Sequence, residues 1–210
     1  MKALIEMRVS DLLAEFAAGR AAPAAGSAAA FTGALAAALV EMVARLTVEK
    51  ADLGTERLRV RYGPYRSRAE ELVAAAAVLR GELEALVQED AVGVEALVRH
   101  RSEAPGGIQS EGLLRQSVDI PMRTARAALQ VAEYAEELFA QGYQSAAGDA
   151  DVAARLALSA AESALAIVAA NLADARLDGE WAQCASNERR LLSDRLLPLL
   201  TRHTKQQSPG

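Results

Sequence analysis

The sequence predicts an all-α fold, a multihelical bundle of long helices rich in Ala and Leu. Of its 210 residues, 51% are hydrophobic but only 4% are aromatic, and alanine and leucine supply much of the apolar content. Alanine is the strongest helix former, and few segments show the apolar–polar alternation of a half-buried strand. Because alanine-rich faces bury little area each, we expect closely packed long helices or an extensive contact between two copies.

The length of the chain fits one domain, so we expect a single helical domain over residues 1–200 and a flexible tail over residues 201–210. The net charge of −5 argues against nucleic acid or an anionic membrane as a partner. The single cysteine and the acidic residues near the N-terminus predict a cytoplasmic protein without a secretory signal. Residues 21–40 are uncharged, but small residues dominate them and Pro23 interrupts them, which favours soluble core over a membrane span.

A short first helix is predicted to begin at Ser10 and stop at Gly19, with a turn over residues 20–26. In this turn Pro23 fixes its own φ, and Gly26 can adopt a positive one. Such a turn brings backbone N–H groups beside a helix N-terminus, which suits a carboxylate or a polarised carbonyl. The alternative is a plain tight turn that packing requires.

The long helix after this turn is predicted to be central and buried. Ser27 is a good N-cap, residues 28–40 carry no charge, and the helix should end near Thr47. Small residues leave room for the backbone of another helix. The large apolar residues recur at helical spacing: Phe31, Leu35, Leu39, Met42 and Leu46.

Residues 50–68 are predicted to be a connector with an unusual distribution of arginine. Arg57, Arg59 and Arg61 alternate with apolar residues, and Tyr62 and Tyr65 follow. Guanidinium groups beside aromatic rings can hold an anionic tail such as a glutamate chain. The alternative is an ordinary solvated surface.

Pro64 is placed to open a long helix that runs to about His100. Its apolar seam consists of Leu72, Ala76, Leu79, Leu83, Leu86, Val94 and Leu97. Asp90 occupies the seam position between Leu86 and Val94, so desolvation should raise the pKa of its carboxyl. A carboxyl that keeps its proton near neutral pH can act as a general acid. The alternative is an aspartate at the edge of the seam, exposed or paired with an arginine.

The rest of the chain continues the helical pattern. A helix over residues 110–141 contains Pro121 and should kink there, and Asp149 is well placed at the start of the next helix. Asn171 near the end of that helix is either a ligand contact or a core amide bonded to a neighbouring helix. Two histidines far apart and acids without a histidine nearby give no support for a catalytic triad or a metal site, so we expect none.

Several of these segments resemble one family. Pro-x-x-Gly-Ser-Ala-Ala-Ala from Pro23, and the stretch Leu-Val-Glu-Met-Val-Ala-Arg-Leu-Thr that ends at Thr47, are similar to the cyclodeaminase/cyclohydrolase domain of folate metabolism. Glu89-Asp90-Ala91 is similar to the family's Asp-x-Asp-Ala, whose aspartate is the proposed proton donor. This chain departs from the family pattern where alanines replace two glycines before Gly26 and where Gln88 replaces the first aspartate.

The resemblance implies a homodimeric enzyme that acts on 5-formimino- or 5,10-methenyltetrahydrofolate without a metal or redox cofactor. Asp90 would be the general acid or base. Substrate contacts would come from Gly26, Ser27, Lys50, Asp149 and Asn171. The departures from the family pattern leave an alternative, a non-catalytic folate-binding or helical interaction module with an altered pocket.

Overall fold

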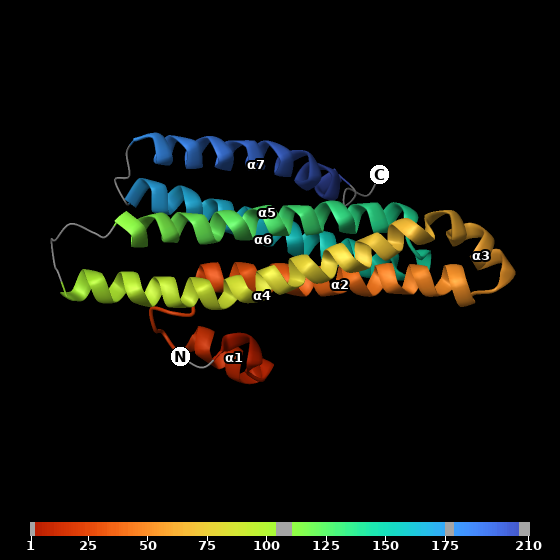
Figure 1. Ribbon diagram of the computed structural model, residues 1–210, viewed down its shortest axis with the longest axis horizontal. Coiled ribbons are helices and arrows are strands. Elements are labelled where there is room, and N and C mark those ends of the chain that lie inside the picture. The colour runs from red at the N-terminus through yellow and green to blue at the C-terminus, as the bar shows by residue number, and fades with distance from the viewer. Residues whose placement is uncertain (1–2, 104–110, 175–178, 206–210) are drawn as a thin grey trace.

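The computed structural model describes residues 3–103, 111–174 and 179–205 (Figure 1). Within these ranges every regular element is helical, which confirms the predicted all-α bundle. The elements in chain order are η1 (Leu4–Glu6), α1 (Val9–Ala17), α2 (Ala25–Leu53), α3 (Glu56–Tyr62), η2 (Gly63–Tyr65), α4 (Arg66–Glu103), α5 (Glu111–Gln141), η3 (Gln144–Ala146), α6 (Ala147–Asp174) and α7 (Glu180–Lys205).

Four long helices, α2, α4, α5 and α6, form the body of the bundle, and α2 packs against the other three. On α4, Arg80 pairs with Glu41 of α2, and Arg66 at the start of α4 pairs with Asp52 near the end of α2, so these two helices run antiparallel. In Figure 1, α7 lies along one side of the bundle, α1 lies on the opposite side, and α3 covers one end.

The helix α2 is central, as predicted, and its core-facing side consists mainly of small residues together with Val40 and Val43. Ala30, Ala37 and Gly33 are buried, whereas Leu35 is 47% exposed and Met42 is 37% exposed. The physical reason is close approach: a Cβ on Gly33 would lie 3.1 Å from the Leu83 side chain of α4. Neighbouring helices therefore contact the small face of α2, and Leu35 and Met42 are left exposed on its outer face.

Several predicted boundaries differ from the observed ones. The helix α2 continues past Thr47 to Leu53, and the predicted connector is largely helical, since α3 and η2 fill it. Ser10 lies inside α1, whose N-cap residue is Arg8. The last helix, α7, continues to Lys205, which is inside the segment predicted to be a tail, and residues 206–210 lie outside the described residues.

Among the described residues, two helical stretches are long and apolar enough to cross a membrane, Ala25–Leu53 and Gln144–Ala173. Length and composition alone are weak support for a span, because the core helix of a soluble protein passes the same test. In α2, 56% of the apolar window is buried within the bundle, and in the second stretch 39% is buried. This burial fits the interpretation of residues 21–40 as core.

Candidate active site

Asp90 lies on α4 at the point where this helix passes the first turn of α2. The residue is only 7% exposed, and its carboxyl group faces Gly26 and Ser27. The apolar seam of the sequence predicted an inward direction for this side chain, and the structure agrees. A catalytic role for the group stays a prediction.

Gly26 is required at this contact because it has no side chain. A Cβ built on it would lie 2.8 Å from Oδ2 of Asp90 and closer still to Oδ1 and Cγ. The sequence argument for this glycine was different, namely a positive φ in a turn. In the structure Gly26 is helical, and the glycines of positive φ among the described residues are Gly19 and Gly179. The need for glycine is therefore steric and not conformational.

Ser27 is fully buried and bonded to the same carboxyl group. Its Oγ donates to Oδ2 of Asp90 at 2.8 Å, and its backbone N–H also donates to this carboxyl group. The prediction that Ser27 is the N-cap is wrong, because α2 begins at Ala25 and its N-cap residue Ala24 offers no side-chain acceptor. Asp90 of α4 caps α2 instead. Its carboxyl accepts the backbone N–H of Ser27, a first-turn N–H that has no acceptor within α2.

Two opposing effects act on the proton of Asp90. Burial raises the pKa of its carboxyl, and the hydrogen bonds from the Ser27 hydroxyl and backbone lower it, with burial the larger effect. The pKa therefore lies above the ordinary value of an aspartate. Such a group can hold a proton that an exposed aspartate would lose, which is the property required of a general acid.

This shift predicts how stability depends on pH. The pKa of Asp90 in the folded chain lies above 3.8, so its contribution to stability is present below that pH and lost as the pH rises through the folded value. Asparagine has no proton to lose. We therefore expect the stability of Asp90→Asn relative to wild type to increase between about pH 4 and about pH 7. Urea unfolding across this range measures the difference, and a flat or falling difference contradicts the assignment.

The residues just before Asp90 hold α4 in place. Gln88 Oε1 accepts the backbone N–H of Leu4 at 2.8 Å, which ties the N-terminal η1 to α4. Glu89 pairs with Arg123 of α5 at 2.6 Å. Sequence reasoning missed both contacts, because each joins residues far apart in the chain and neither residue type is unusual on a helix surface.

Asn171 lies at the same end of the bundle and bonds to α5, the helix that contains Pro121. Its Nδ2 donates to the carbonyl oxygen of Ser117 at 2.7 Å. This carbonyl would normally accept from the residue four positions later, which is Pro121 and has no N–H. The sequence left two roles open for Asn171, a ligand contact or a core amide. This contact fits the core amide, because it supplies the hydrogen-bond donor that Pro121 cannot supply to the Ser117 carbonyl.

This pairing predicts a coupling between two substitutions. Asn171→Ala should cost about 1 to 3 kcal/mol, because the Ser117 carbonyl loses its partner. In a Pro121→Ala background, residue 121 regains an N–H for this carbonyl, so the cost of Asn171→Ala should fall to less than about half. Unfolding free energies of the four variants give the coupling. Equal costs in the two backgrounds would contradict this role for Asn171.

Lys50 and Asp149 are not brought to the Asp90 carboxyl. Along the continuous helix α2, the 23 residues from Ser27 to Lys50 span about 34 Å at 1.5 Å per residue. Lys50 pairs with Glu49 and lies over the ring of Tyr143, near the start of α6 where Asp149 is found. Within one copy of the chain, Lys50 therefore lies far from the Asp90 carboxyl.

The arginine-rich segment divides into two parts. Arg66 and Arg68 are held by acids, Arg66 by Asp52 and Glu70, and Arg68 by Glu137 and Glu71. Three more arginines lie exposed on α3: Arg57, Arg59 and Arg61. Binding of an anionic tail by this segment stays a prediction that concerns these three.

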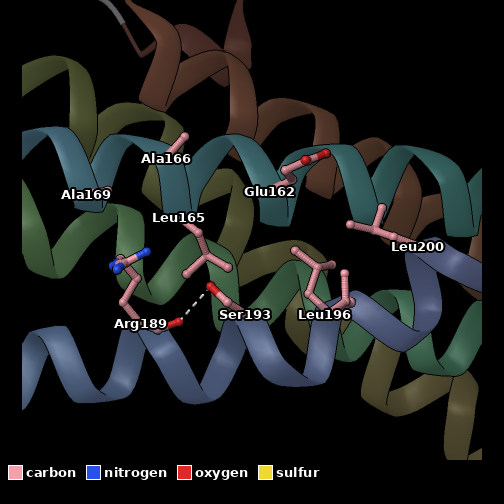
Figure 2. Close-up of a pocket in the computed structure, with 9 residues that line it drawn as sticks. Glu162, Leu165, Ala166, Ala169, Arg189, Ser193, Leu196 and Leu200 are labelled. Atoms are coloured by element: carbon pink, nitrogen blue, oxygen red, sulfur yellow. Dashed lines mark hydrogen bonds between the residues drawn. The ribbon is translucent and has the colours of Figure 1, made fainter.

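A hollow between α6 and α7 is lined mainly by apolar side chains, unlike the site around Asp90 (Figure 2). It has a volume of about 280 Å³, and leucines line much of it, among them Leu165, Leu196 and Leu200. The Ser193 hydroxyl in this hollow donates to the carbonyl of Arg189 at 2.9 Å. Within the part of the chain that the structure describes, no group of three or more His, Cys, Asp or Glu residues could hold a metal ion. Glu162 also lines the hollow but is exposed, whereas Asp90 is the acid that is buried among the described residues, so Asp90 is the best candidate for acid–base chemistry.

Comparison with known proteins identifies the family of the chain. A family model described as formiminotransferase-cyclodeaminase matches residues 8–190. The crystal structure of formiminotetrahydrofolate cyclodeaminase from Thermotoga maritima is similar to this chain, with a TM-score of 0.80 and 22% identity over 95% of each chain. At this identity the likeness shows the fold alone, and no curated protein matches the sequence. Because the family model spans most of its length, the chain belongs to the formiminotransferase-cyclodeaminase family.

Proposed function

We propose that this protein is a cytoplasmic folate enzyme that cyclises 5-formiminotetrahydrofolate and releases ammonia. The observation that carries the proposal is the buried Asp90 carboxyl, held by the first turn of α2 and with a raised pKa. Membership of the family supports a folate substrate. The similar Thermotoga maritima structure bears the name of this activity.

The proposed reaction needs a group that both gives and takes a proton. Asp90 in its acid form protonates the imino nitrogen of the substrate, and N10 attacks the formimino carbon. The carboxylate then takes the proton of N10 and passes it to the former imino nitrogen, which leaves as ammonia when the carbon–nitrogen bond breaks. The product is 5,10-methenyltetrahydrofolate, and solvent returns a proton to Asp90. No metal or redox cofactor enters this scheme.

The proposed roles of the other residues follow from their positions. Gly26 leaves the space that the carboxyl occupies, and Ser27 orients it through two donors. Asn171 supports α5 at the same end of the bundle. We also propose that the protein is a homodimer, in which Lys50 and Asp149 contact folate only from the partner subunit.

The experiment is an assay of the purified protein with 5-formiminotetrahydrofolate. Formation of the methenyl compound is followed by ultraviolet absorbance, and released ammonia is measured separately. The proposal expects both products in equal amounts. Formation of neither by a folded protein contradicts it.

The same protein is then assayed with 5,10-methenyltetrahydrofolate, because hydrolysis of the methenyl bridge needs the same acid. Loss of methenyl absorbance without ammonia release from the first substrate identifies a cyclohydrolase instead. A thermal shift with reduced folates but no turnover of either compound identifies the alternative, a folate-binding module.

A further inference from the structure

The outer face of α2 carries an apolar stripe that the described part of the chain covers only partly. Apart from one adjacent pair at its centre, its members are three or four residues apart, so they share one side of the helix. Leu35 is 47% exposed and Met42 37% exposed, and the others are half-buried. We call this the α2 stripe: Phe31, Leu35, Ala38, Leu39, Met42 and Leu46. Large apolar side chains in a continuous exposed row mark a contact surface more often than a solvent face.

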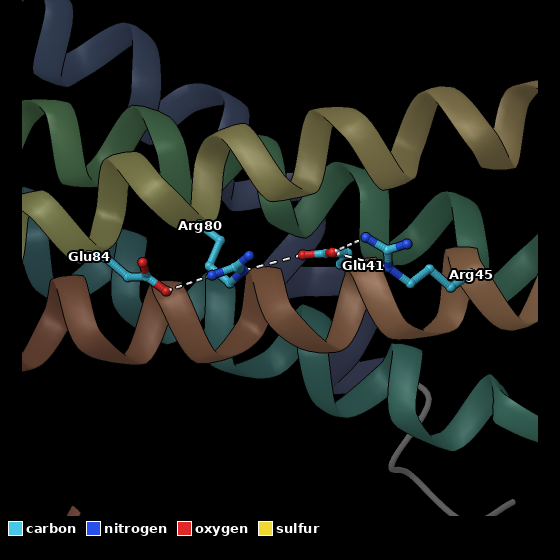
Figure 3. A network of polar contacts seen from close by, with 4 residues as sticks. All are labelled: Glu41, Arg45, Arg80 and Glu84. Carbon is cyan, nitrogen blue, oxygen red and sulfur yellow. Dashed lines mark hydrogen bonds and ion pairs between the residues drawn. The ribbon is translucent and has the colours of Figure 1, made fainter. Parts of the chain in front are cut away.

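The charged residues beside the stripe are already engaged with one another (Figure 3). Glu41 accepts from Arg45 of its own helix and from Arg80 of α4, and Arg80 also bonds to Glu84. This ladder lies between α2 and α4, and its two acids balance its two arginines. The stripe therefore has a polar rim on that side whose charges neutralise one another, as the rims of protein interfaces often have.

The stripe is symmetric about the midpoint between Ala38 and Leu39. Leu35 lies as far before this point as Met42 lies after it, and the same holds for Phe31 and Leu46. Two copies of α2 packed antiparallel at this midpoint would therefore set Leu35 against the partner's Met42. The small Ala38 at the centre allows the two helices to approach closely.

Charge favours the antiparallel arrangement over the parallel one. Residues 28–40 are uncharged, and Arg45 and Glu49 lie in the second half of the helix. Parallel packing would oppose Arg45 to the partner's Arg45 and Glu49 to the partner's Glu49. Antiparallel packing brings the partner's Glu49 to the first turn of α2, which contains no acidic residue and carries the positive end of the helix dipole.

We propose that the α2 stripe is the contact between two copies of this chain, packed antiparallel about a two-fold axis at the Ala38–Leu39 midpoint. This deepens the proposed homodimer and does not depend on the reaction. The partner subunit then lies beside the turn that holds Asp90, because the stripe begins one helical turn after Ser27.

The first test is the association state of the full chain by sedimentation equilibrium. We expect a dimer for wild type, and Leu35→Glu should weaken it at least about a hundredfold, because each copy would bury an unpaired carboxylate. The matched control is Val152→Glu on α6, where the replaced side chain is 48% exposed, and it should dimerise as wild type does. Circular dichroism confirms that both variants fold.

The second test is the direction of packing, by disulfide crosslinking in a Cys184→Ser background. Ala38→Cys should crosslink with itself, and Leu35→Cys should crosslink with Met42→Cys more readily than with itself. Self-linking of Leu35→Cys in preference overturns the antiparallel contact. A wild-type chain that stays monomeric also overturns the proposal, and this includes a monomer that binds phosphatidylcholine vesicles. Equal effects of Leu35→Glu and Val152→Glu on dimerisation overturn it as well. Because none of these readouts uses folate, failure of the proposed reaction leaves them unchanged.

Discussion

Replacement of Asp90 by asparagine is expected to lower turnover of the folate substrate at least about a hundredfold, because the variant loses its acid and base. The fold should survive. The asparagine oxygen can still accept from the hydroxyl and the backbone N–H of Ser27, so the stability at neutral pH should change by less than about 2 kcal/mol. Steady-state kinetics and urea unfolding measure the two quantities on the same sample.

The matched control for this variant is Asp119→Asn on α5. Partial desolvation also raises the pKa of the Asp119 carboxyl, but this side chain is largely exposed, lies near Arg126 and Arg115, and has no contact with Gly26. It should keep wild-type turnover. Full activity of Asp90→Asn, or equal losses in the two variants, would remove Asp90 from the mechanism.

Gly26→Ala is expected to destabilise the protein by about 1 to 3 kcal/mol and to remove activity, because the new methyl group occupies the space of the Asp90 carboxyl. The sign of this change is informative. At an ordinary helical position, exchange of glycine for alanine stabilises a protein by about 0.5 to 1 kcal/mol. The free energy of unfolding in urea decides between the two signs.

Gly81→Ala is the control for this second prediction. Gly81 lies within α4, and a Cβ built there meets no atom within 4 Å, so the substitution should stabilise the chain. If Gly26→Ala proves as stable as Gly81→Ala, the carboxyl can move aside at little cost. The contact between Gly26 and Asp90 would then be loose, and the argument for a precisely held acid would fail.

Helical periodicity predicted the fold and the direction of Asp90 well. An apolar seam on a long helix has only one side that faces the core, so an acid within the seam must point inward. The same periodicity predicted that α2 is central, with small residues that leave room for another helix, but it did not decide which side of α2 the other helices contact. Composition shows that one face is small and another large, but it does not show which neighbours come near, and close approach of α4 and α5 selected the small face.

The local sequence by itself determined the helices, the single inward acid and the glycine–serine pair at the start of α2, because these depend on propensity and on spacing along one helix. Only the tertiary structure decided what each residue does. It placed the Asp90 carboxyl in the space that a Cβ on Gly26 would fill, and it paired the Asn171 amide with the carbonyl that Pro121 leaves without a helical N–H donor. It also placed Lys50 at the far end of α2. The contact between Ser27 and Asp90 joins residues 63 positions apart in the chain, and that between Asn171 and Ser117 joins residues 54 apart. The way that whole helices dock sets such contacts, which no local pattern encodes.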